Sequence, residues 1–102
     1  MDLASFHRSL AEPAPPAGLG LALEALWWDA KGDWQKAHEC AQARDDGQGA
    51  WVHAYLHRRE GDAGNAAYWY RRAGKPVPSA ALDEERAAII EALLSAPAST
   101  RR

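Results

Sequence analysis

A short pattern occurs twice in this chain, 29 residues apart, and it restricts the fold more than any other feature of the sequence. Residues 31–37 (Lys-Gly-Asp-Trp-Gln-Lys-Ala) align with residues 60–66 (Glu-Gly-Asp-Ala-Gly-Asn-Ala). Glycine is favoured just after a helix because it adopts the left-handed backbone conformation, and aspartate is favoured as the residue that caps the next helix. Each Gly-Asp pair therefore predicts a tight turn between two antiparallel helices. Two such turns predict two helical hairpins.

Composition supports the same all-α fold class. Alanine, the best helix former, accounts for 23 of the 102 residues, whereas valine, isoleucine and threonine together account for only five. A chain of this length builds one domain with a modest core. We expect the hairpin helices at residues 19–31, 34–44, 48–60 and 63–73, followed by a C-terminal helix that ends near residue 95 and caps the open face.

Proline separates the beginning of the chain from this body. Three prolines in residues 13–18 favour an extended linker. Before it, Leu3, Phe6 and Leu10 follow a helical spacing and predict a short amphipathic helix, which must dock because so short a helix is marginal alone. The predicted organisation is a short N-terminal helix (1–12), a linker (13–18), one helical domain (19–95) and a frayed tail (96–102).

The hairpins also resemble a known family. Residues 66–74 read Ala-Ala-Tyr-Trp-Tyr-Arg-Arg-Ala-Gly, which is similar to the second helix of Sel-type repeats. Together with the Gly-Asp turns and with Ala25 and Ala54 in the first helices, residues 19–74 resemble the tetratricopeptide repeat and its Sel-type relatives. The 29-residue spacing is shorter than the family's repeat of about 34 residues. The resemblance implies a helical array that binds protein ligands along the first helices of its repeats, in a concave groove.

In the second repeat, the resemblance places five residues on or near that groove. Within this set, Trp51 and Tyr55 are i, i+4 neighbours, and two arginines follow one turn later. Aromatic rings supply contact area and arginine binds carboxylates through two hydrogen bonds, so the strip suits an extended or acidic peptide. The alternative is that the rings belong to the core and the arginines are solvated or paired with residues 83–85. The predicted peptide site consists of Gln48, Trp51, Tyr55, Arg58 and Arg59.

Charge is unevenly distributed along the chain. Residues 53–75 contain five arginines and lysines against two acids, whereas residues 83–91 contain four acids and one arginine. One interpretation is internal, with the acidic C-terminal helix lying against the basic hairpin. The other is a surface for an anionic ligand, including RNA. The net charge of −2 argues against nucleic acid as the partner.

Few residues offer a chemical site. His53 and His57 are four residues apart, so both rings share one helix face and can hold one metal ion. A third ligand is not evident, because His38 and Cys40 are two residues apart and point to different sides of their helix. Nothing around Cys40 suggests a catalytic nucleophile. We therefore expect no metal site, no cofactor and no enzymatic activity.

Five tryptophans are many for this length, and most should fill gaps between alanine-lined helices. Trp27 and Trp28 point about 100° apart on a helix, and residues 68–70 are three consecutive aromatics. At least one ring from these runs should therefore be partly exposed, where it can contribute to a binding surface.

The function expected from these observations is a non-catalytic protein–protein interaction module that binds a peptide or associates with a second copy as a homodimer. The alternatives are a metal-binding or enzymatic helical protein that uses His53 and His57, and RNA binding through the basic hairpin. No segment is long and apolar enough for a membrane span, the N-terminus has no signal-peptide pattern, and Cys40 is the only cysteine. These features favour a cytoplasmic location.

Overall fold

Six α-helices make up the computed structural model of this chain, which describes residues 1–44 and 46–95. Those residues contain no β-strand, which confirms the all-α fold class. Asp45 and the predicted frayed tail at 96–102 fall outside the described residues. The helices are α1 (Leu3–Ser9), α2 (Leu21–Lys31), α3 (Trp34–Gln42), α4 (Gly47–Arg59), α5 (Ala63–Ala73) and α6 (Leu82–Ser95).

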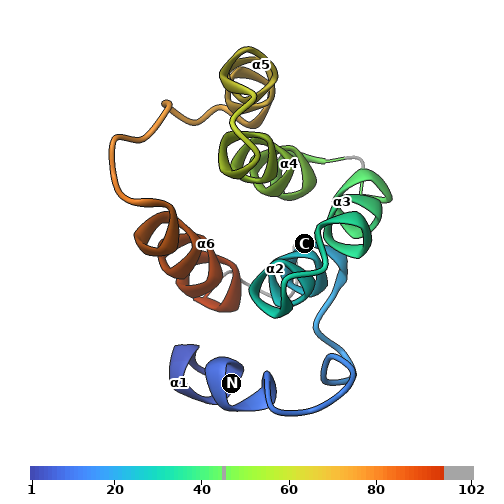
Figure 1. Cartoon of the computed structure of the whole chain (residues 1–102). Helices are drawn as coiled ribbons and strands as arrows, with labels where there is room; N and C mark the ends of the chain where they lie inside the picture. The colour runs from blue at the N-terminus through green and yellow to red at the C-terminus, as the bar shows by residue number, and fades with distance from the viewer. Residues whose placement is uncertain (45, 96–102) are drawn as a thin grey trace, which may run out of the picture.

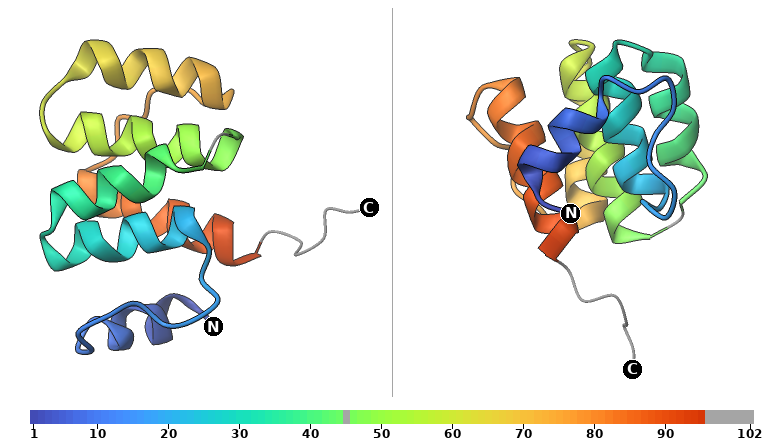
Figure 2. Two further views of the ribbon diagram at one scale, coloured as in Figure 1. Left: turned by 90° about the vertical axis from the view of Figure 1, so that its right-hand side faces the viewer. Right: turned by 90° about the horizontal axis from the view of Figure 1, so that it is seen from below.

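The helices form a stacked array with one helix laid across it. Helices α2 and α3 form the first hairpin and α4 and α5 the second, and the first is joined to the second by contacts between α3 and α4. Figure 2 shows the first five helices stacked in chain order, with α6 behind them. Helix α6 packs against α2 and α4, the first helices of the two hairpins, and also against α1. The C-terminal helix therefore covers part of the face on which the peptide groove was predicted.

The two Gly-Asp turns have the same hydrogen-bond pattern. Gly32 N donates to the Asp29 carbonyl at 3.0 Å, and Gly61 N donates to the Arg58 carbonyl at 3.1 Å. The aspartate after each glycine then caps the following helix, accepting from Lys36 N at 3.0 Å in α3 and from Asn65 N at 3.2 Å in α5. Both glycines have a φ of +89°, so the left-handed conformation expected from the sequence is present at both turns.

Replacing Gly61 with valine should lower the free energy of unfolding by about 1–3 kcal/mol, because a β-branched residue is strained at positive φ. A β-carbon at this position meets no atom within 4 Å, so the cost is backbone strain and not a steric clash. The same result is expected for Gly32, and asparagine should be milder at either site. Urea unfolding measures the difference.

Gly64 supplies the matched control. It lies in the first turn of α5, a β-carbon there also meets open space, and its φ is not positive. Gly64→Val should therefore change stability by only a few tenths of a kcal/mol. If Gly61→Val and Gly64→Val behave alike, the left-handed turn does not contribute to stability as argued.

Helix α2 lies at the centre of the core, as its nearly uniform apolar sequence predicts. Leu26 and Trp27 are fully buried, together with Phe6 from α1 and Ile89 from α6. Trp28 is only partly buried, and Lys36 Nζ lies 4.2 Å from the centre of its ring. One ring of the adjacent tryptophan pair is therefore partly exposed, as predicted.

Helix α1 is held against the rest of the molecule by both apolar and polar contacts. Phe6 is fully buried, and Trp27 Nε1 donates to Ser9 Oγ at 3.0 Å. Lys31 Nζ donates to the carbonyl of Leu10 at 2.8 Å, just after the helix ends. These contacts explain how a seven-residue helix persists.

Candidate functional site

The charged side chains of α6 pair with the basic end of α4. Arg58 donates to Glu85 Oε1 at 2.8 Å and to the Ala80 carbonyl, and Arg59 donates to Asp83 Oδ1 at 2.6 Å. The hydrogen bond from Arg59 holds the pKa of the Asp83 carboxyl below its ordinary value. The basic hairpin and the acidic last helix therefore meet inside the molecule, which is the internal interpretation of the charge pattern.

Tyr55 lies beneath this ion-paired surface. Its side chain is fully buried, and its hydroxyl donates to Asp29 Oδ2 at 2.6 Å while accepting from Arg59 Nε at 2.6 Å. Burial, together with the hydrogen bond to Asp29, raises the pKa of the Tyr55 hydroxyl. Tyr55 is therefore a core residue that links α4 to α2.

The predicted peptide site is corrected by these contacts. Its C-terminal half (Tyr55, Arg58 and Arg59) is not an open strip, because α6 covers the ring and neutralises both guanidinium groups. The physical reason is charge complementarity: the acids of the first turn of α6 lie where a ligand carboxylate was expected.

The N-terminal half of the predicted site remains open. Gln48 and Trp51 line a surface pocket of about 430 Å³ between α4 and α6, and Trp51 also lines an adjoining, mostly apolar pocket of about 240 Å³. Lys75 lines both pockets, with its Nζ 4.3 Å from the centre of the Trp51 ring. We call this continuous surface the Trp51 groove; its lining includes Gln48, Trp51, Lys75, Pro76, Pro78 and Ala88, together with the acids Asp46, Glu84 and Glu85.

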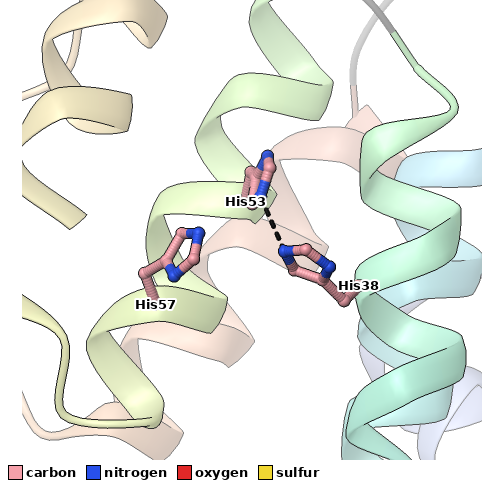
Figure 3. A group of neighbouring side chains, drawn as sticks. All are labelled: His38, His53 and His57. Carbon is pink, nitrogen blue, oxygen red and sulfur yellow. Dashed lines mark hydrogen bonds between the residues drawn. The ribbon is translucent and has the colours of Figure 1, made fainter. Parts of the chain in front are cut away.

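A second cluster lies on the other side of α4, where three histidines converge (Figure 3). His53 and His57 come from α4 and His38 comes from α3, and one ring nitrogen of each lies within 4.8 Å of the other two. His38 Nε2 and His53 Nε2 are 2.8 Å apart, so one of them donates a hydrogen bond to the other. We call His38, His53 and His57 the histidine cluster.

The expectation that His53 and His57 lack a third partner is therefore wrong. His38 lies three residues before Ala41, which is buried against the core, so both face inward from α3. The three-residue spacing of His38 and Ala41 was the feature of the sequence from which the inward position of His38 could have been predicted. Only the packing of α3 on α4 shows that His38 meets His53. Cys40 points elsewhere and packs beside the core, where burial raises the pKa of its thiol.

The connection between α3 and α4 requires a glycine. A β-carbon at Gly49 would clash with the carbonyl oxygen of Arg44, which lies just after α3. The aspartate that precedes α4, Asp46, accepts from Gly49 N at 2.9 Å and caps the helix. This tight connection brings His38 against His53.

The environment of His38 and His53 favours neutral rings. Burial lowers the pKa of His53 to about 4, and nearby His38 and His57 add to that effect. Burial also lowers the pKa of His38, with a further contribution from His57. His57 Nδ1 donates to Glu60 Oε1 at 2.7 Å, which leaves its Nε2 with a lone pair when the ring is neutral.

Two tryptophans stack on the cluster. The Trp34 ring lies 4.6 Å from that of His38, and the Trp69 ring lies 4.1 Å from that of His53, both nearly parallel. Trp34 is 37% exposed and Trp69 is partly exposed, so the cluster is close to the surface. His53 and Trp69 also line a pocket of about 450 Å³ between α3 and α5. The cluster is therefore flanked by two stacked tryptophan rings and is accessible from solvent.

Comparisons against protein-family models, curated proteins and solved structures returned no match to this chain. The resemblance to tetratricopeptide and Sel-type repeats therefore stays a prediction.

Among the described helices, none has the length and apolar character that crossing a membrane requires.

Proposed function

We propose that this chain is a non-catalytic protein–protein interaction module that binds an extended peptide in the Trp51 groove. The observation that carries the proposal is the position of Trp51, whose ring lies at the junction of two adjoining surface pockets. A partly exposed tryptophan in a concave surface is the residue type that most often dominates a peptide interface.

The residues that line the groove determine which peptide side chains fit it. Pro76, Pro78 and Ala88 make the smaller pocket mostly apolar, which suits an aliphatic or proline side chain. Lys75 places an ammonium group over the Trp51 ring and beside both pockets, which suits a carboxylate on the peptide. We therefore propose a ligand with an apolar side chain next to an acidic residue or a terminal carboxylate.

Selection of peptides from a random library on the purified chain tests this proposal. Selected peptides should share an apolar residue beside an acidic one, and Trp51→Ala should weaken their binding about 30-fold, as expected for an interface hot spot worth about 2 kcal/mol. Lys75→Ala should reduce the preference for the acidic residue. Calorimetric titration of a selected peptide measures both effects.

Trp34→Ala is the matched control, because Trp34 is also partly exposed but lies in α3, beside the histidine cluster. It should leave peptide binding unchanged. Peptides that bind Trp51→Ala as tightly as the unchanged chain would contradict the proposal. A dimer that Trp51→Ala converts to monomer would instead place a second copy in the groove. The cytoplasmic location stays a prediction.

A further inference from the structure

We propose that His38, His53 and His57 form a binding site for a divalent transition-metal ion, with Zn²⁺ as the best-suited ion. This site is separate from the Trp51 groove and does not depend on peptide binding. It rests on the convergence of three imidazoles from two helices and on their accessibility from solvent.

The donor set selects the class of ion. Three neutral imidazole nitrogens suit Zn²⁺, Cu²⁺ and Ni²⁺, whereas Ca²⁺ and Mg²⁺ prefer oxygen ligands. Three protein ligands and one open position form a common four-coordinate arrangement for zinc. Water or a small anion can take the fourth position, since His38 and His57 are both partly exposed to solvent.

The distances require only small side-chain movements. Zinc–nitrogen bonds of about 2.0–2.1 Å in a tetrahedral site place two ligating nitrogens about 3.3 Å apart. His38 Nε2 and His53 Nε2 are now 2.8 Å apart and share one proton in a hydrogen bond. Metal binding would move that proton to the Nδ1 atom of the same ring, separate these two nitrogens slightly and draw the third nitrogen inward from within 4.8 Å.

Glu60 acts as an outer partner of the site. Its carboxylate accepts from His57 Nδ1 at 2.7 Å, which orients the ring and leaves Nε2 as the nitrogen that can bind metal. A carboxylate behind a ligating histidine is the usual outer contact in zinc proteins and increases the basicity of the ligand. Glu60 is thus a positioning residue, not a ligand.

Stacking by Trp34 and Trp69 limits the rotation of His38 and His53. The rings are therefore held in place before an ion arrives, and this reduces the cost of binding.

Titration of the purified, metal-free full chain with Zn²⁺ alone tests the proposal. One ion per chain should bind with a Kd of about 1 μM or tighter, and the melting temperature should rise with zinc concentration. Co²⁺ substituted into the site should give the visible absorption of a four-coordinate ion. Failure to bind one equivalent of Zn²⁺ below about 100 μM would overturn the proposal.

His38→Gln is the decisive variant, because it leaves the His53–His57 pair on α4 intact. It should weaken Zn²⁺ binding at least 100-fold and abolish the Co²⁺ spectrum, while the unchanged helical circular dichroism shows that the fold persists. Glu60→Gln should weaken binding about 10–100-fold, as expected for an outer-shell carboxylate. If His38→Gln binds Zn²⁺ as tightly as the unchanged chain, the three-histidine site is wrong.

Two controls separate this site from other donors. His7 lies in α1 and Cys40 lies beside the core, and neither belongs to the histidine cluster. His7→Gln and Cys40→Ser should both bind Zn²⁺ with unchanged affinity. Loss of binding in either variant would place the ion elsewhere and overturn the assignment.

Discussion

Replacing Asp29 with alanine should lower the free energy of unfolding by about 3–5 kcal/mol, the cost of removing one partner from a buried ion pair. The Asp29 carboxylate is 4% exposed and joins three helices: it accepts from Tyr55 Oη in α4 at 2.6 Å and from Arg86 in α6 at 3.0 Å. Its loss leaves the Tyr55 hydroxyl buried without its acceptor and removes the buried one of the two carboxylates that Arg59 and Arg86 share. Urea unfolding monitored by circular dichroism measures the change.

Asp83→Ala is the matched control for this network. Asp83 pairs with the same two arginines, Arg59 at 2.6 Å and Arg86 at 3.5 Å, but its side chain is 78% exposed. Exposed ion pairs contribute about 0–1 kcal/mol, so this variant should be nearly as stable as the unchanged chain. Similar losses for Asp29→Ala and Asp83→Ala would show that burial does not set the strength of the network.

Removing α6 should abolish the cooperative fold. The fully buried side chains of Ile89 and Ile90 pack in the same core as Trp27 and Phe6, and Glu85 accepts hydrogen bonds from Arg58 and from the buried Tyr70 hydroxyl. A chain that ends at Pro78 should therefore aggregate or lose its thermal transition. Ile89→Ala, the single-residue version, should cost about 2–5 kcal/mol through lost burial and the cavity that remains.

Glu91→Ala, on the exposed side of α6, is the control and should shift stability by no more than about 0.5 kcal/mol. Thermal unfolding compares the three proteins. A truncated chain that is monomeric and melts cooperatively would mean that the two hairpins are stable without α6, and that the helix has a different role.

The helix ends at the two Gly-Asp turns were predictable because their causes are local. Gly32 and Gly61 adopt the left-handed conformation, and the following aspartates cap α3 and α5 through contacts within three residues of themselves. The buried positions of α2 were predictable for a related reason, since a helix that is apolar on nearly every side must be covered. The partial exposure of Trp28 followed from the angle between neighbouring side chains.

The predicted peptide site was harder to assess from the sequence. The spacing of Trp51, Tyr55, Arg58 and Arg59 placed them correctly along one helix, α4. Whether α6 covers α4 depends on the angle and position at which α6 packs, and no local sequence pattern encodes these. In the structure, the predicted site falls into two parts. Tyr55 and the two arginines contact the acids Asp29, Glu85 and Asp83, whereas Trp51 lies beside an open groove.

By itself, the sequence of this chain determined the all-α class, the two hairpins, the turns between their helices and the opposite charges of α4 and α6. These features follow from backbone preference, helical periodicity and charge, which act between near neighbours or over whole segments. Only the tertiary structure decided which side chains meet. His38 and His53 are 15 residues apart in sequence, yet their Nε2 atoms are 2.8 Å apart because α3 packs on α4. Helix packing fixes distances between distant residues to a fraction of a helical turn, and a site made of such residues exists only once that packing is known.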